Sequence, residues 1–301
     1  MKIVSQPKLR AFHDKIAGLT FFDPACGCGN FLVIAYREIR RLETECIRRL
    51  AEKQHITGQR AIGLDLLCKV QVDHFYGIEI EEFPARIART ALYLVDHLEN
   101  RRVSVEFGEH YTRFPIPATP HIQVGNALRD AWNALLPAAD CDYLFGNPPF
   151  AGQKTREADQ TADMHYVWRA GFARWLDYVT GWYRVAADYI AMSGARAAFV
   201  STNSITQGEQ VARVWRTMLG KNIKIDFAHR TFVWTSEARG PAIVHVVIIG
   251  FSAVRRESRR VIYDYPDVKG EPIAEAVSHI NPYLLDAPDV IVESSTNDLQ
   301  F

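Results

Sequence analysis

The sequence has no net charge, because its 35 lysine and arginine residues balance 35 aspartate and glutamate residues. Enzymes that grip DNA usually carry a basic face, since phosphate contacts supply much of the affinity. The balance therefore weighs against a complete DNA-binding enzyme, unless the DNA-gripping part is local or lies outside this chain.

Long apolar runs are also missing. The longest, Ala242–Phe251, is too short to span a bilayer and includes His245. The first residues have no apolar core of the kind that a secretory signal needs. We therefore expect a cytoplasmic protein that has no membrane partner.

Cysteine is scarce, with 5 residues in 301. An odd number without a secretory signal favours reduced thiols over a disulfide framework. Cys26 and Cys28 lie close together, but no second pair of cysteines or histidines stands at metal-ligand spacing. No metal site is predicted.

What the sequence does have is enough apolar residues, 48 %, to bury a sizeable core. Short β-rich runs alternate with helical stretches, which predicts an α/β fold with a doubly wound, mostly parallel sheet of about seven strands. The last two strands have no helix between them and should pair as an antiparallel hairpin at an edge of the sheet. We expect strands at Leu19–Phe22, His74–Ile80, Ile122–Gly125, Tyr143–Phe145, Ala197–Ser201, Ile223–Ala228 and Ala242–Phe251, and helices at Asn30–Gln54, Pro84–Leu98, Met164–Met192 and Gly208–Leu219.

The character of the chain changes near Ser252, where a charged run gives way to a segment interrupted by prolines. We interpret residues 1–251 as one catalytic domain. Residues 252–301 are too few and too broken for a full domain, and we expect the start of a C-terminal extension or a truncated recognition region.

The first predicted strand runs into a glycine-bearing loop, Asp23-Pro24-Ala25-Cys26-Gly27-Cys28-Gly29, and then into a helix. Open α/β sheets bind ligands at the carboxyl ends of their strands. Gly27 and Gly29 would let the backbone turn and approach a ligand, and Asp23 could accept hydrogen bonds from an ammonium group or water. Because neither the dinucleotide fingerprint nor the Walker lysine is present, a nucleotide-binding oxidoreductase is disfavoured.

Two further strands end in polar residues. Glu79 closes the second strand, where its carboxylate could accept both hydroxyls of a ribose. Asn126 follows the third strand, where its amide could read the edge of an adenine. Taken alone, each is more often a solvated strand end or a turn.

The strongest motif follows the fourth strand as Gly146-Asn147-Pro148-Pro149-Phe150. The two prolines fix the backbone, so that a main-chain carbonyl points outward instead of into a strand ladder. Asn147 adds a side-chain carbonyl, and the two acceptors can hold one amino group. Phe150 offers a flat apolar surface on which a base can stack.

In this order, the segments Asp23–Phe31, Gly77–Ile80, Gly125–Leu128 and Gly146–Phe150 resemble the amino-methyltransferases that act on DNA. The order and the residues of these segments are most similar to the methyltransferase part of MmeI-like (Type IIL) enzymes of prokaryotes, which join restriction and modification in one chain. The resemblance extends over Leu19–Phe251 and includes Trp182–Ile190, Phe199–Gly208 and Phe232–Thr235.

This resemblance implies a class I, Rossmann-like fold and S-adenosylmethionine as the cofactor. Its activity would be methylation of the N6 amino group of adenine in a restriction-modification or related defence system. The implied partner is double-stranded DNA with one adenine flipped out. The cofactor would contact Asp23, Pro24, Ala25, Cys26, Gly27, Gly29, Glu79, Ile80, Asn126 and Ala127, and the catalytic residues would be Asn147, Pro148, Pro149 and Phe150.

The sequence departs from the family pattern at two points. Many relatives have aspartate where this chain has Asn126. Relatives also usually have a cofactor-contacting segment before the first strand and a recognition domain after the last. We expect a fragment, a split subunit or a degenerate copy, with recognition supplied by a domain or subunit outside this chain.

Two alternatives stay open at this stage. The first is the same chemistry on RNA or on a glutamine amide of a protein, because the Asn-Pro-Pro-Phe motif also occurs in such enzymes. The second is a catalytically silent subunit for DNA recognition or assembly.

Overall fold

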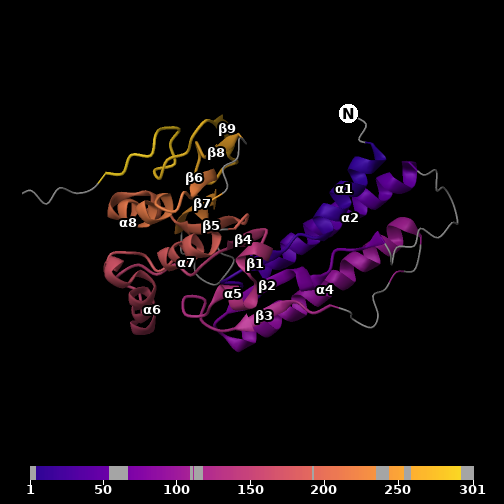
Figure 1. Cartoon of the computed structure of the whole chain (residues 1–301), viewed down its shortest axis with the longest axis horizontal. Helices are drawn as coiled ribbons and strands as arrows, with labels where there is room; N and C mark the ends of the chain where they lie inside the picture. The colour runs from indigo at the N-terminus through magenta and orange to yellow at the C-terminus, as the bar shows by residue number, and fades with distance from the viewer. Residues whose placement is uncertain are drawn as a thin grey trace, which may run out of the picture. The chain divides into compact units, whose positions relative to one another are not determined.

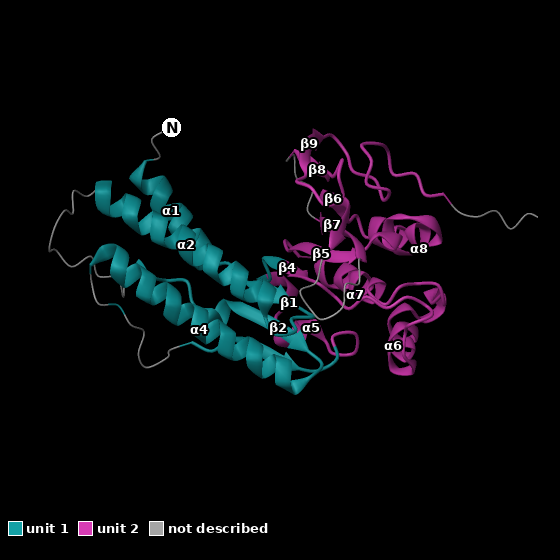
Figure 2. Cartoon of the chain, turned by 180° about the vertical axis from the view of Figure 1, so that it is seen from behind, with its two compact units in different colours: residues 1–126, 140–143 teal, residues 127–139, 144–301 magenta. Residues whose placement is uncertain are grey.

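The computed structural model describes residues 5–53, 67–108, 111, 118–191, 193–234, 244–253 and 259–292 (Figure 1). Within these ranges strands alternate with helices, and nine strands are formed. The predicted α/β class is therefore confirmed. The chain divides into two compact units: unit 1 holds residues 1–126 and 140–143, and unit 2 holds residues 127–139 and 144–301 (Figure 2).

Unit 1 contains a sheet of parallel strands. The central strand β2 pairs in parallel with β1 on one side and with β3 on the other. Because the three strands run the same way, their carboxyl ends reach the same edge, where an open α/β sheet binds its ligand. The strands are β1 (Phe21–Asp23), β2 (Phe75–Glu79) and β3 (His121–Val124).

Long helices accompany these strands. The helix α2 packs against both α1 and α4. Arg40 of α2 is completely buried and donates to Glu43 at 3.1 Å and to Asn100 of α4 at 2.8 Å. A buried charge is tolerated only when it is paired in this way, so this polar network fixes the approach of the two helices. The helices are α1 (Gln6–Ala17), α2 (Asn30–Lys53) and α4 (Glu82–Phe107).

Unit 2 contains a mixed set of strands in the order β4-β5-β7-β6-β8-β9. The strand β7 pairs antiparallel with β5 and with β6, which confirms the predicted hairpin. The strand β8 then adds in parallel to β6, and β9 adds antiparallel to β8, so the hairpin is not at the edge. The strands are β4 (Tyr143–Gly146), β5 (Arg196–Thr202), β6 (Lys224–Trp234), β7 (Val244–Ser252), β8 (Arg260–Asp264) and β9 (Ile273–Val277).

The prediction of one helix over Met164–Met192 is wrong. The helix α6 ends at Trp168, and Arg169 takes a φ of 49°, a value that non-glycine residues seldom adopt and that cannot continue a helix. Irregular chain then leads to α7, which begins at Thr180. The helices of unit 2 are α5 (Trp132–Leu135), α6 (Ala158–Trp168), α7 (Thr180–Ile190) and α8 (Gly208–Leu219).

Candidate active site

The loop between β1 and α2 is a tight turn that favours glycine at two positions. The Gly29 N–H donates to the Cys26 carbonyl at 2.8 Å and closes the turn. Gly27 and Gly29 have φ values of 54° and 84°, in the left-handed region. A Cβ at Gly29 would lie only 2.9 Å from the Cβ of Ala88 in α4, whereas one at Gly27 would meet no atom within 4 Å. Gly29 thus permits close packing, and Gly27 leaves the loop open.

Asp23 closes β1 and is 1 % exposed. Its Oδ1 accepts the N–H of Ala25 at 2.9 Å. The pKa of Asp23 is raised from 3.8 to about 7, mainly by burial. The hydrogen bond from Ala25 lowers this pKa, and the nearby charge of Glu79 adds to the rise. A cation brought to this carboxyl would favour its ionised form.

Glu79 closes β2 and is half-buried. Its Oε2 accepts the N–H of Gly27 at 2.9 Å, and its Oε1 accepts the N–H of Glu81 at 3.0 Å. The carboxylate therefore fastens the glycine loop to the end of β2, a role that the sequence did not predict. Each carboxylate oxygen has a second lone pair, so both can still accept from a ligand.

Gly77 is a site residue that the sequence analysis missed. A Cβ at this position in β2 would lie 2.9 Å from the Sγ of Cys26. A glycine inside a strand often marks such an approach of another backbone or side chain. Cys26 itself is buried, and burial raises the pKa of its thiol. The thiol stays protonated and fills space beneath the loop.

The remaining cofactor candidates follow β2 and β3. Ile80 is 63 % exposed, directly after Glu79. Asn126 is half-buried and follows Gly125, whose N–H donates to the Glu79 carbonyl at 2.9 Å. Ala127 belongs to unit 2, where its carbonyl accepts from the indole of Trp132 at 2.8 Å. Unit 1 therefore brings together the candidates from Asp23 to Asn126.

The Asn-Pro-Pro-Phe segment lies in unit 2, directly after β4. Pro148 is buried and Pro149 is exposed, while Asn147 and Phe150 are half-buried. The Oδ1 atom of Asn147 is buried, yet it has no hydrogen-bond partner among the residues that the structure describes. Leaving a buried acceptor unpaired costs about 1–3 kcal/mol, so the segment holds an acceptor ready for a donor.

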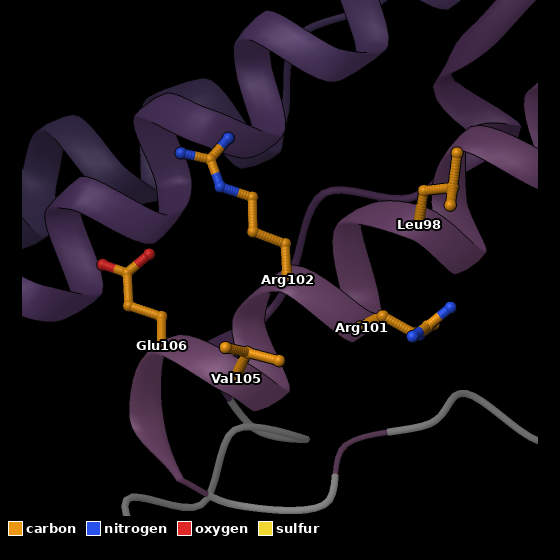
Figure 3. Close-up of a pocket in the computed structure, with 5 residues that line it drawn as sticks. All are labelled: Leu98, Arg101, Arg102, Val105 and Glu106. Carbon is orange, nitrogen blue, oxygen red and sulfur yellow. The ribbon is translucent and has the colours of Figure 1, made fainter.

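A surface pocket elsewhere in unit 1 shares no residue with these candidates. It lies along the last turns of α4, where two arginines and a glutamate stand beside two exposed apolar side chains (Figure 3). Its lining residues are Leu98, Arg101, Arg102, Val105 and Glu106. We assign the chemistry to the strand ends, where the buried polar groups are.

Two features are absent from the part of the chain that the structure describes. No three histidine, cysteine or acidic side chains there form a cluster that could hold a metal ion. No helix there is long and apolar enough to cross a membrane.

Comparison with known proteins places this geometry in context. Residues 2–264 match the DNA-methyltransferase domain of MmeI. The chain is 34 % identical over 296 residues to DNA methyltransferase A of Bacillus subtilis strain 168, which is 97 % of this chain and 32 % of that protein.

Two solved structures are also similar to this chain. The structure of the Type IIL restriction-modification enzyme MmeI in complex with DNA matches with a TM-score of 0.90 and 52 % identity, over 95 % of this chain and 38 % of that one. The type IIG restriction endonuclease BpuSI matches with a TM-score of 0.50 and 10 % identity, over 88 % of this chain and 27 % of that one, a likeness of fold alone. The chain thus spans about a third of the length of the first two relatives.

Proposed function

Because the chain belongs to the family of MmeI DNA-methyltransferase domains, we propose that it transfers the methyl group of S-adenosylmethionine to the N6 amino group of adenine in DNA. The setting is a restriction-modification or related defence system, in the cytoplasm of a prokaryote. The observation that carries the proposal is the buried, unpaired Oδ1 of Asn147.

The exocyclic amine of adenine is a poor nucleophile, because its lone pair is delocalised into the ring. Asn147 Oδ1 and a neighbouring main-chain carbonyl would accept its two N–H bonds, which favours a tetrahedral nitrogen with a free lone pair. Catalysis then depends on positioning and electrostatics, without a covalent enzyme intermediate. Phe150 would stack on the base, which recovers roughly 1–3 kcal/mol of the cost of taking it out of the duplex.

The residues of unit 1 fit the proposed cofactor. When bound, S-adenosylmethionine supplies a methyl group activated by a sulfonium. Buried Asp23 provides a carboxyl for the cationic amino acid end, and the left-handed glycines let the loop approach it. The Glu79 carboxylate keeps acceptor capacity for a ribose while it holds the loop. Asn126 would contact the adenine through an amide.

The proposed substrate is double-stranded DNA, and we propose that sequence recognition comes from a domain or subunit outside these residues. The match covers only 32 % of DNA methyltransferase A and 38 % of the MmeI chain. The same chemistry on RNA or on a protein glutamine, and a catalytically silent subunit, are the competing functions.

The test is transfer of tritium from methyl-labelled S-adenosylmethionine to unmethylated phage DNA, to RNA and to protein, followed by nucleoside analysis. We expect label in N6-methyladenine alone. Label in N4-methylcytosine, RNA or protein would give the activity to a competitor. Cofactor binding without any transfer would favour the silent subunit.

Two variants separate methyl transfer from cofactor binding. Asn147→Ala should reduce transfer by about 100-fold or more, the scale on which a single transition-state hydrogen-bonding group acts, and should leave cofactor affinity unchanged. Glu79→Ala should have the opposite pattern, because its main effect should be weaker cofactor binding. Equal loss of cofactor affinity in Asn147→Ala would contradict the assignment of Asn147 to the target amine.

A further inference from the structure

The Asn-Pro-Pro-Phe segment is stiffened at its start by two prolines, but a loop also needs a fixed far end. That end is Ala151, whose carbonyl accepts the N–H of Tyr178 at 2.8 Å. Asp177 and Tyr178 lie in the irregular chain before α7, far from the motif in sequence. What holds these two residues also holds the end of the catalytic segment.

Asp177 connects this point to the end of β5. Its Oδ2 accepts the hydroxyl of Thr202 at 2.9 Å and also the hydroxyl of Ser204, and these two hydroxyls lie 2.8 Å apart. Its main-chain N–H donates to Gln210 Oε1 in α8 at 3.1 Å. Asp177 is therefore held by Thr202 of β5, by Ser204 just after β5 and by Gln210 of α8.

Tyr178 is held from the other side. Its hydroxyl donates to Asp163 Oδ2 at 2.9 Å, and Asp163 Oδ1 accepts from Arg129 at 2.6 Å. Asp163 and Tyr178 are both buried. Charge-assisted hydrogen bonds of this kind are about twice as strong as neutral ones.

Arg156 adds a second tie between the two segments. Its guanidinium donates to the carbonyl of Leu176 at 2.6 Å and to that of Arg174 at 3.1 Å. The N–H of Arg156 itself donates to the carbonyl of Gly152 at 3.0 Å. The chain from Ala151 to Arg156 is thus bonded at both of its ends to the chain from Arg174 to Tyr178.

We propose that Asp177 is a positioning residue for methyl transfer: it anchors Tyr178, which fixes the far end of the Asn-Pro-Pro-Phe segment and so sets the place of Asn147 Oδ1. The methyl-transfer part of this inference rests on the proposed function. Asp177 itself is not proposed to contact the base or the cofactor. Without the anchor the segment keeps its sequence and its prolines but loses its fixed position.

The experiment combines amide hydrogen exchange with kinetics on Asp177→Ala, Asp177→Asn and a control, Asp188→Ala. Asp188 is a matched aspartate of unit 2 that pairs with Arg184 and Lys221 at the surface. In Asp177→Ala we expect faster exchange at Tyr178 and over Phe150–Arg156, and a kcat about 10- to 100-fold lower, since misplacement of about 1 Å can cost that much. KM for S-adenosylmethionine should change less than about twofold, because that site is in unit 1.

Asparagine keeps an oxygen that can accept both hydroxyls, so Asp177→Asn should recover most of the protection and of kcat. Asp188→Ala should match the wild type. Unchanged exchange at Tyr178 in Asp177→Ala, or faster exchange with an unchanged kcat, would overturn the proposal. If Asp177→Ala fails to fold, Ser204→Ala decides it by the same exchange readout, with faster exchange at Tyr178 in support and no change against.

If the wild-type protein transfers no methyl group, the proposed function has failed. The exchange data then still decide whether Asp177 anchors the segment, so the two failures are distinguishable.

Discussion

At the scale of single residues, the structure holds two polar groups in states that a ligand would relieve. Asn147 Oδ1 is buried without a partner, and Asp23 is a carboxyl buried deeply enough for its pKa to reach about 7. Each state costs stability in the ligand-free protein. Perturbed groups of this kind cluster at functional sites, because the same environment that strains them prepares them for a ligand.

The raised pKa of Asp23 predicts how stability depends on pH. The unfolded chain loses the Asp23 proton near pH 3.8, whereas the folded chain keeps it until about pH 7. Across that window the folded state binds more protons, so the Asp23 contribution to the free energy of unfolding falls as pH rises and is constant above about pH 7. In chemical denaturation, the difference in the free energy of unfolding between the wild type and Asp23→Asn should change with pH inside this window and stay constant above it. A difference that is constant at every pH would show that the pKa of Asp23 is not raised in the folded protein.

Cofactor binding should have the opposite trend. A cationic amino acid end favours ionised Asp23, so binding releases a proton below about pH 7 and affinity increases as pH rises to that value. Calorimetry at several pH values in two buffers with different ionisation heats measures the released proton. Asp23→Asn should release none, and release by that variant would assign the proton to another group.

The glycine loop and Asn147 could be placed at the ends of strands from sequence, because each motif directly follows a short apolar run. The partners of Glu79 and Asp177 could not. Glu79 bonds to Gly27, fifty-two positions away in the chain, and Asp177 to Ser204, twenty-seven positions away. No local pattern encodes such bonds, since they exist only after β1 has met β2 and after β5 has met the irregular chain before α7.

At the scale of elements, the contact between α4 and the glycine loop is a testable constraint. Gly29→Ala would place a Cβ 2.9 Å from Ala88 and keep a φ of 84°. Overpacking costs about 1–3 kcal/mol, and left-handed backbone adds about 1–2 kcal/mol. We expect a loss of roughly 2–5 kcal/mol in the free energy of unfolding, measured by urea denaturation.

Gly27→Ala is the matched control, because its φ of 54° is also left-handed but its Cβ would meet open space. It should cost only the backbone part, about 1–2 kcal/mol. The double variant Gly29→Ala, Ala88→Gly should regain only part of the overpacking cost, because the Cα of residue 88 would still lie 3.0 Å from the new Cβ. Equal losses in Gly29→Ala and Gly27→Ala would show that α4 does not constrain the loop.

Most elements with a clear hydrophobic period were predicted, although the helix α1 and the strand β8 were not. The strands of unit 1 lie within a few residues of their expected places because they are short apolar runs. The strand β9 was missed because prolines interrupt the segment after Ser252, although four of its own five residues are apolar. The break between α6 and α7 was missed because Arg169 gives no sequence signal for a positive φ.

At the scale of the whole molecule, the residues after Ser252 differ from the expected broken tail. The strands β8 and β9 extend the pairing of β6, so residues 260–277 are part of unit 2. Strands whose backbones are committed to this ladder do not form a separate recognition domain. We therefore keep residue 251 as the proposed end of the catalytic domain, although the strand pairing of unit 2 continues past that residue.

The last prediction is that this chain alone binds duplex DNA weakly and with little sequence preference. Its formal charge is zero, and specific recognition usually buries roughly 1,000–2,500 Å² of protein surface with an element in a groove. The described strands after β7 are paired within the sheet, and this chain covers only 38 % of the MmeI chain. Fluorescence anisotropy with duplexes of several sequences, at low and at physiological salt, measures both affinity and the salt slope. We expect a dissociation constant in the range of about 10⁻⁴–10⁻⁶ M at physiological salt, typical of non-specific binding, and nearly equal values for all duplexes. Tight binding to one sequence with a shallow salt slope would instead place base recognition within these 301 residues.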